Sequence, residues 1–184
     1  MLPLYNQWVT RVFTRVPTNM SGSLNSKLLT LPSLRVLPEW IDYNGHMNVA
    51  YYVLAFDKAV DALMDTIGIT PSYIEQYHSS TFTLEIHVNY IQELRLGDPI
   101  SLNCHLLDFD AKRIHYFMYM RQANENYLAA TSEQIMMHVN LENRRSSEFP
   151  NHIVAQLEAL RDAHNELPRP ENCGSVIGIR RKQQ

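Results

Sequence analysis

The sequence predicts an α+β fold in which one long helix is wrapped by an antiparallel β-sheet. Two observations lead to this expectation. Residues 48–67 carry apolar side chains at helical spacing over most of the helix circumference, so this helix must be largely buried. Short apolar or alternating segments, separated by turn sequences, follow it along the chain. A curved sheet around the helix is an economical way to bury it.

The first elements are a short strand, a loop and the long helix. Residues 33–37 are predicted to form a strand that ends at Pro38, because proline has no N–H for a sheet ladder. The polar segment 42–48 follows as a loop, and Gly68 is a typical helix end. One stripe of the helix between them consists of apolar residues, namely Val49, Val53, Phe56, Val60 and Met64.

Residues 71–76 are expected to form a short helical turn, and a strand with regular alternation is expected after it. One predicted face of that strand holds Phe82, Leu84, Ile86, Val88 and Tyr90. The other holds Thr81, Thr83, Glu85, His87 and Asn89. Turn sequences then separate three more strands, predicted at 100–107, 113–121 and 127–139. An amphipathic helix over 151–165 and a basic tail close the chain.

The length of 184 residues fits one domain. We expect an N-terminal extension at 1–30, a core domain at 31–150, and a C-terminal helix with a basic tail at 151–184. Residues 1–19 contain two arginines and no acid. Two interpretations of this start stay open: an organellar presequence, or a reading frame extended upstream of Met20.

Composition excludes several classes of protein. A net charge of −3 argues against a nucleic-acid partner, and no apolar run approaches the roughly 18 residues of a membrane span. The two cysteines, Cys104 and Cys173, lack disulfide or metal-site spacing, which indicates a reducing compartment and a cytoplasmic location. The eight histidines show no metal-binding motif, so no metal site is expected.

The sequence resembles a known family through a motif at 42–48, Asp-Tyr-Asn-Gly-His-Met-Asn, directly before the long helix. That motif and the order of elements resemble the hotdog-fold thioesterases of the 4-hydroxybenzoyl-CoA thioesterase-like superfamily. Segments 80–85, 97–98 and 144–150 extend the resemblance over roughly residues 42–150. A narrower resemblance, to the thioesterases of carnitine degradation that act on betainyl-CoA, rests on segments 38–48, 112–117 and 177–181.

The resemblance implies a hotdog fold and an acyl-CoA thioesterase that needs no cofactor, coenzyme A being part of the substrate. It also implies a homodimer or a dimer of dimers, in which subunits pair through their sheets and share active sites. The expected reaction is hydrolysis of a short polar acyl-CoA, with betainyl-CoA as the first candidate. The alternatives are a fatty or aromatic acyl-CoA, a dehydratase or hydratase reaction, and an acyl-CoA-binding module without catalysis.

Asp42 is the first candidate for the catalytic carboxylate. It would attack the thioester directly or activate a water molecule, and the sequence does not decide between these routes. Asn44 would orient Asp42 or hold the water, and His46 would hydrogen-bond to the carbonyl oxygen or the leaving thiolate. Asn48 is expected to cap the helix, whose free N–H groups can polarise the thioester carbonyl. The alternative for each is an ordinary turn or solvated residue.

Glu85 matches an acidic residue that plant-type acyl-carrier thioesterases have on the corresponding strand, so the resemblance implies a second catalytic carboxylate. If its face is solvated, Glu85 is only a surface residue. Three residues after the last strand are candidates for the phosphates of coenzyme A, namely Arg144, Arg145 and Ser146. Four aromatic residues around the motif are candidates for contact with a quaternary ammonium group, or else core residues: Trp40, Tyr43, Tyr51 and Tyr52.

Overall fold

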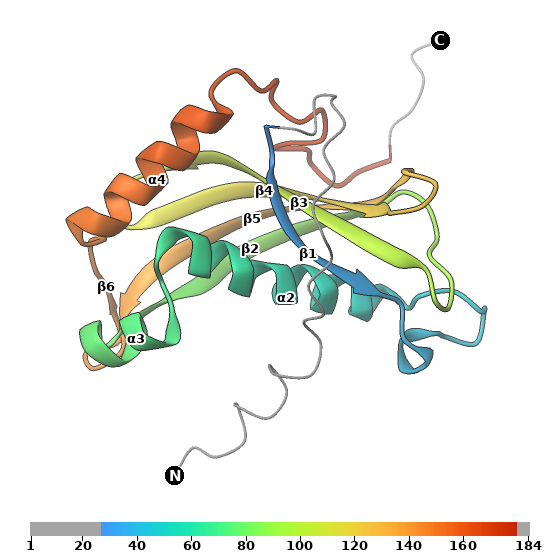
Figure 1. Ribbon diagram of the computed structural model, residues 1–184, viewed down its shortest axis with the longest axis horizontal. Coiled ribbons are helices and arrows are strands. Elements are labelled where there is room, and N and C mark those ends of the chain that lie inside the picture. The colour runs from blue at the N-terminus through green and yellow to red at the C-terminus, as the bar shows by residue number, and fades with distance from the viewer. Residues whose placement is uncertain (1–26, 180–184) are drawn as a thin grey trace.

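The computed structural model describes residues 27–179, in which an antiparallel six-stranded sheet curls around one long helix (Figure 1). The strands run in the order β1-β3-β4-β5-β2, and the short β6 pairs with β5. Their bounds are β1 (Leu29–Arg35), β2 (Ser79–Tyr90), β3 (Pro99–Phe109), β4 (Arg113–Gln122), β5 (Leu128–Asn140) and β6 (Arg145–Ser146). This arrangement confirms the predicted α+β architecture.

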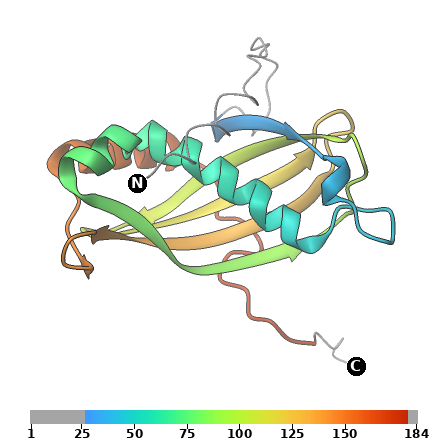
Figure 2. The same cartoon turned by 90° about the horizontal axis from the view of Figure 1, so that it is seen from below.

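The long helix, α2 (Val49–Ile67), begins and ends where the sequence predicts. The Asn48 side chain accepts a hydrogen bond from the Ala50 N–H at the first turn. Gly68 ends the helix with φ of 91°, a left-handed conformation that glycine adopts without steric cost. The helix lies along one face of the sheet (Figure 2), and eight of its residues are buried: Tyr52, Ala55, Phe56, Ala59, Val60, Leu63, Met64 and Ile67.

Three shorter helices complete the described part of the chain. They are η2 (Pro38–Trp40), α3 (Pro71–Tyr77) and α4 (Asn151–His164). The buried residues of α4 are Ile153, Leu157 and His164, which agrees with the predicted amphipathic helix. Within residues 27–179 every helix is too short or too polar to cross a bilayer.

The first strand differs from the prediction, which placed it at 33–37. β1 instead covers Leu29–Arg35, and its pairing with β3 is irregular between Leu31 and Leu34. Pro32 lies at this irregularity on an edge strand, where a missing N–H removes no ladder hydrogen bond. Two residues assigned to the N-terminal extension therefore belong to the sheet. Residues 1–26 of that extension, and the end of the basic tail from 180, lie outside the described residues.

The predicted alternation of β2 is wrong beyond Thr83. Thr83 pairs with Met136 and Glu85 with Ile135, so Leu84 is an extra residue in a β-bulge. Since the side-chain period of a strand is two, the bulge moves every later side chain to the other face. Val88 now packs on the core, and the Tyr90 ring meets Tyr52 of α2 at 5.3 Å. Glu85 and His87 consequently join Phe82 on the face that points away from α2.

The chain after α4 returns across the sheet on the face opposite α2 (Figure 2). A hydrogen bond of 2.7 Å from the Gly174 N–H to Glu133 Oε2 on β5 fastens this segment to the sheet. The two faces of the sheet are therefore covered by different parts of the chain. Helix α2 forms the core on one face, and part of the C-terminal tail lies on the other.

Candidate active site

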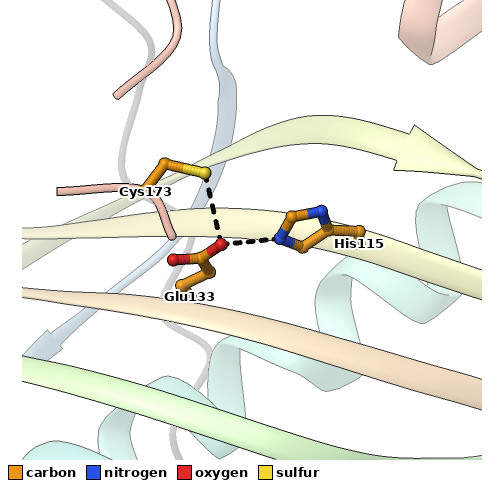
Figure 3. Close-up of side chains that lie close together, drawn as sticks. All are labelled: His115, Glu133 and Cys173. Atoms are coloured by element: carbon orange, nitrogen blue, oxygen red, sulfur yellow. Dashed lines mark hydrogen bonds and ion pairs between the residues drawn. The ribbon is translucent and has the colours of Figure 1, made fainter. Parts of the chain in front are cut away.

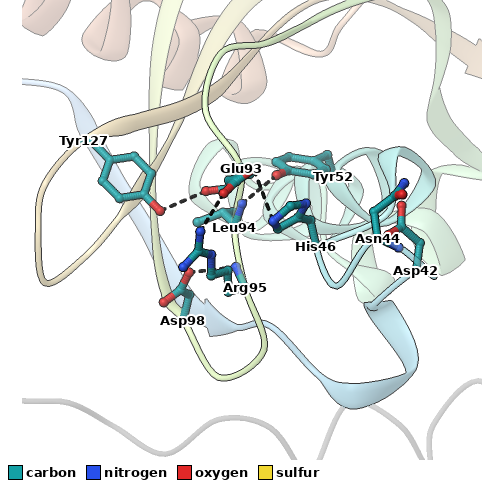
Figure 4. A network of polar contacts seen from close by, with 9 residues as sticks. All are labelled: Asp42, Asn44, His46, Tyr52, Glu93, Leu94, Arg95, Asp98 and Tyr127. Atoms are coloured by element: carbon teal, nitrogen blue, oxygen red, sulfur yellow. Dashed lines mark hydrogen bonds and ion pairs between the residues drawn. The ribbon is translucent and has the colours of Figure 1, made fainter.

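The 42–48 motif forms a closed loop in front of α2 (Figure 4). The Asp42 N–H donates to the His46 carbonyl at 2.9 Å, and the Gly45 N–H donates to the Asp42 carbonyl at 3.0 Å. A β-bridge between Ile41 and Met47 closes the base of the loop. Gly45 has φ of 80°, which explains the need for glycine at this turn. Asp42 and His46 are therefore held at the N-terminal end of the helix by backbone geometry.

The Asp42 carboxylate is half-buried and has one fixed contact. Its Oδ1 accepts a hydrogen bond of 2.8 Å from the Asn44 backbone N–H. Within residues 27–179 no donor engages Oδ2, so this oxygen is available to a substrate or a water molecule. Asp42 thus has the turn role that its residue type favours, and this turn uses only its Oδ1. Asn44 therefore contacts Asp42 through its own backbone N–H.

His46 is paired with a residue that the sequence analysis did not single out. Its Nε2 lies 3.2 Å from Oε2 of Glu93, in the loop after β2. The Arg95 guanidinium donates to the other Glu93 oxygen at 2.8 Å, and this hydrogen bond is the main reason why the pKa of Glu93 is lowered. The Asp98 carboxylate accepts from the Arg95 N–H, and the Tyr127 hydroxyl donates to the Glu93 carbonyl (Figure 4). Glu93 is therefore a fixed anionic partner for the imidazole.

The same loop after β2 also holds the start of α2. The Met47 N–H donates to the Leu94 carbonyl at 2.8 Å, and the Leu94 N–H donates to the Tyr52 hydroxyl at 3.1 Å. Burial raises the pKa of Tyr52, whose side chain is 4% exposed. Tyr52, predicted to contact the acyl group, thus has its hydroxyl oxygen engaged inside the protein.

The other predicted aromatic residues are distributed unevenly. Trp40 is 4% exposed, and its ring stacks on that of Tyr51 with centroids 5.8 Å apart. Tyr43 is 97% exposed at the tip of the 42–48 loop. The structure therefore brings Trp40 and Tyr51 together beside the motif but does not gather all four aromatic rings around one space. Asn48, a further candidate, uses its side-chain oxygen to cap α2.

The remaining candidates lie away from Asp42 within one chain. Glu85 is exposed on β2, on the face opposite α2. Arg144, Arg145 and Ser146 lie at or beside β6, near the C-terminal end of α2 (Figure 1), whereas the motif lies at its N-terminal end. All three are exposed, and the Arg144 guanidinium lies over the Phe82 ring at 5.1 Å. One chain by itself does not assemble the whole predicted site.

Comparison with known families identifies the chain. The sequence model of the "Thioesterase-like superfamily" matches residues 36–157. The chain belongs to this superfamily. It is 41% identical over 154 residues to the betainyl-CoA thioesterase of Pseudomonas aeruginosa, covering 84% of this chain and 97% of that protein. It is 35% identical over 153 residues to the L-carnitine dehydrogenase/betainyl-CoA thioesterase of Rhizobium meliloti, covering 83% of this chain and 31% of that longer protein.

Two solved structures are similar to this chain in sequence and in fold. A Staphylococcus aureus protein solved in complex with CoA matches with a TM-score of 0.78 and 33% identity, over 83% of this chain and 96% of that one. A putative thioesterase from Pseudomonas putida matches with a TM-score of 0.73 and 33% identity, over 84% and 98%. These findings confirm the hotdog fold and the expectation of a thioester hydrolase that acts on acyl-CoA.

Proposed function

We propose that this thioesterase hydrolyses betainyl-CoA to betaine and CoA, and that it serves the breakdown of carnitine. The observation that carries the proposal is the closed loop that holds Asp42 and His46 in front of α2. This loop lies in a chain that is 41% identical to a betainyl-CoA thioesterase over nearly all of that protein's length. Two free cysteines, one of them buried, support a reducing compartment such as the cytoplasm.

Hydrolysis needs a polarised carbonyl and an attacking oxygen. The N-terminal end of α2 (Val49–Ile67) offers the Val49 N–H and the positive end of the helix dipole to the thioester carbonyl oxygen. The free oxygen of Asp42 would attack the carbonyl carbon and form a mixed anhydride that water then cleaves. In the alternative route, the same oxygen takes a proton from a water molecule that attacks. In both routes the C–S bond breaks and the thiolate of CoA leaves.

Glu93 determines what His46 can contribute. His46 Nε2 lies 3.2 Å from Oε2 of Glu93, and this carboxylate favours the neutral tautomer with the proton on Nε2 and the lone pair on Nδ1. That lone pair can accept a proton from water. The other role is donation from Nδ1 to the carbonyl oxygen or the leaving thiolate, and it requires a proton on Nδ1. In either role, the contact with Glu93 orients the His46 ring.

The acyl group of betainyl-CoA carries a permanent positive charge on a trimethylammonium group. Aromatic faces attract such a group by cation–π interaction, and Tyr43 and Tyr51, in and next to the 42–48 motif, are not fully buried. The Asp42 carboxylate adds negative charge to the same region, whereas the charge of Glu93 is offset by Arg95. This combination supports a cationic acyl group over an apolar one.

We also infer that two chains pair through their β2 edges. β2 is an edge strand in the described sheet, and it exposes three large apolar side chains, Leu84, Ile86 and Tyr90. An antiparallel pair of β2 strands would bring the β6 end of the partner subunit towards the Asp42 loop. Arg145 of the partner subunit could then reach the phosphates of CoA, which supports an active site shared between subunits.

The test of this function is thiol release from matched acyl-CoA substrates. Betainyl-CoA is compared with 3,3-dimethylbutyryl-CoA, which has the same shape but carbon in place of the charged nitrogen. Acetyl-, 4-hydroxybenzoyl- and palmitoyl-CoA complete the series. We expect kcat/KM for betainyl-CoA to exceed that for the neutral isostere at least tenfold, about 1.4 kcal/mol. Equal values, or a preference for the aromatic or fatty substrate, would contradict the proposed substrate, and no release from any would contradict catalysis.

A further inference from the structure

Three side chains that bind transition metals lie together on the sheet face opposite α2 (Figure 3). His115 comes from β4, Glu133 from β5, and Cys173 from the tail after α4. His115 Nε2 lies 2.8 Å from Oε1 of Glu133, and Cys173 Sγ lies 3.2 Å from the same oxygen. The three ligand atoms all lie within 4.8 Å of one another. The cluster therefore joins three segments that are distant in the sequence.

The fold holds these groups in place without a metal ion. His115 pairs with Ile135 across the β4–β5 ladder, which places Glu133 on the same face two residues along β5. Cys173 is positioned because the next residue, Gly174, donates its N–H to Glu133 Oε2 at 2.7 Å. Side-chain exposures of 27% for His115 and 13% for Glu133 show that the cluster is sheltered but reachable. Only small displacements are needed to admit an ion.

The donor set and its dimensions suit zinc. Zn²⁺ binds imidazole nitrogen, carboxylate oxygen and thiolate sulfur at about 2.0–2.3 Å, so tetrahedral ligands lie about 3.3–3.7 Å apart. The observed separations of 2.8 and 3.2 Å would lengthen slightly when an ion replaces the hydrogen bonds. A dication would be neutralised by one carboxylate and one thiolate, with a neutral imidazole as the third ligand. Hard cations such as Mg²⁺ prefer oxygen-rich sites and fit less well.

An open cavity of ≈ 340 Å³ adjoins the cluster. It is lined by His115 and Glu133 and by two further residues from β2, Glu85 and His87. The bulge at Leu84 is what turns these two side chains to this face. Glu85 and His87 can act as further metal ligands. They can also hydrogen-bond to a water molecule in the fourth coordination position of the metal ion.

We propose that Nε2 of His115, the Glu133 carboxylate and the Cys173 thiolate bind one Zn²⁺ ion, with a fourth position open to the cavity beside Glu85 and His87. The ion fastens the C-terminal tail to the sheet. The site lies on the face opposite α2, apart from the Asp42 loop, so it is independent of the proposed hydrolysis. No metal site was predicted from the sequence, because these ligands have no characteristic spacing along the chain.

The direct test uses Co²⁺ as a spectroscopic substitute for Zn²⁺ in the full-length chain after removal of metals with a chelator. We expect one equivalent of Co²⁺ to give tetrahedral d–d bands and a thiolate-to-cobalt charge-transfer band, both removed by one equivalent of Zn²⁺. Cys173→Ser should lose the charge-transfer band. Cys104→Ala, a change at the other and fully buried cysteine, should keep it. Absence of the band in the unmodified chain, or its survival in Cys173→Ser, would overturn the proposal.

A second measurement does not depend on the thiol. His115→Gln keeps a polar side chain but removes the ring nitrogen, and it should weaken Zn²⁺ binding at least tenfold in a competition titration. Zn²⁺ should raise Tm and slow proteolysis of the tail in the unmodified chain, and should do neither in His115→Gln. Thiol release by metal-free protein should match that of the zinc form. Equal zinc affinity of the variant and the unmodified chain would contradict the assigned ligands, whatever the fate of the proposed hydrolysis.

Discussion

His46 Nε2 lies 3.2 Å from a carboxylate oxygen of Glu93, and this pair joins the loop before α2 to the loop after β2. The backbone makes the same connection, since the Met47 N–H donates to the Leu94 carbonyl. The position of the imidazole therefore depends on two loops far apart in the sequence. Neither residue of the ion pair is buried, so the pair contributes little to the free energy of unfolding. Its role is to orient the His46 imidazole.

Glu93→Gln tests this positioning role. The amide has the size of the carboxylate but not its charge, so the contact that orients the His46 ring should weaken. We expect kcat for the preferred acyl-CoA to fall roughly tenfold or more, with little change in KM. Steady-state kinetics measures both constants. Glu39→Gln, at another exposed acid nearby in η2, should behave as the unmodified chain. An unchanged kcat in Glu93→Gln, or a rise in KM without a fall in kcat, would refute the role.

Arg145→Ala tests the site for CoA phosphates. We expect KM for acyl-CoA to rise roughly tenfold while kcat changes little, since this interaction would be equal in ground state and transition state. The same acyl group on pantetheine lacks the nucleotide, so its KM should be unaffected. Lys58→Ala removes a cation from an exposed position on α2 and serves as the control. A rise in KM for both substrates would show that Arg145 acts on something other than the nucleotide.

The proposed β2 interface predicts the effect of a charge at the sheet edge. Leu84→Asp and Ile86→Asp place carboxylates where two exposed edge strands would meet, and each should shift the protein from dimer to monomer. Sedimentation velocity measures the change. Ala155→Asp makes a similar substitution at an exposed position of α4 and should keep the assembly. If both β2 variants sediment like the unmodified chain, the subunit interface does not involve the β2 edge.

A buried histidine predicts loss of stability in acid. Burial, and then the neighbouring His164, lower the pKa of His105 to about 4 from 6.5. The unfolded chain takes up this proton as pH falls below 6.5, whereas the folded chain does not until about pH 4. Stability should therefore decrease as pH falls through this window, by about 3 kcal/mol at most from this group. Urea denaturation at several pH values should give a shallower dependence in His105→Gln, and an equal slope would exclude His105 as a cause.

The elements with strong local signals were predicted well from the sequence. The helix between Asn48 and Gly68 was correct at both ends, because its cap, its apolar periodicity and its terminal glycine agree. The 42–48 motif was correctly placed as the loop in front of that helix. Such features depend on residues that are neighbours in the chain, which is why the sequence alone determines them.

Features that depend on distant residues were missed. No local pattern marks Leu84 as a bulge, because the irregularity exists only relative to Met136 and Ile135 on β5. Glu93 has an ordinary loop context, and only folding brings it to His46. The first strand was predicted at 33–37, whereas β1 covers Leu29–Arg35 and includes Pro32, which an edge strand accepts.

The most direct test of the central claim is thiol release from betainyl-CoA by the unmodified chain and by Asp42→Asn. The substitution keeps a side-chain oxygen that can accept from the Asn44 N–H, so the loop and the thermal midpoint should persist. We expect kcat to fall at least a hundredfold, about 2.7 kcal/mol, while affinity for CoA is retained. Near-normal turnover by the folded variant would remove Asp42 from the mechanism and contradict the account.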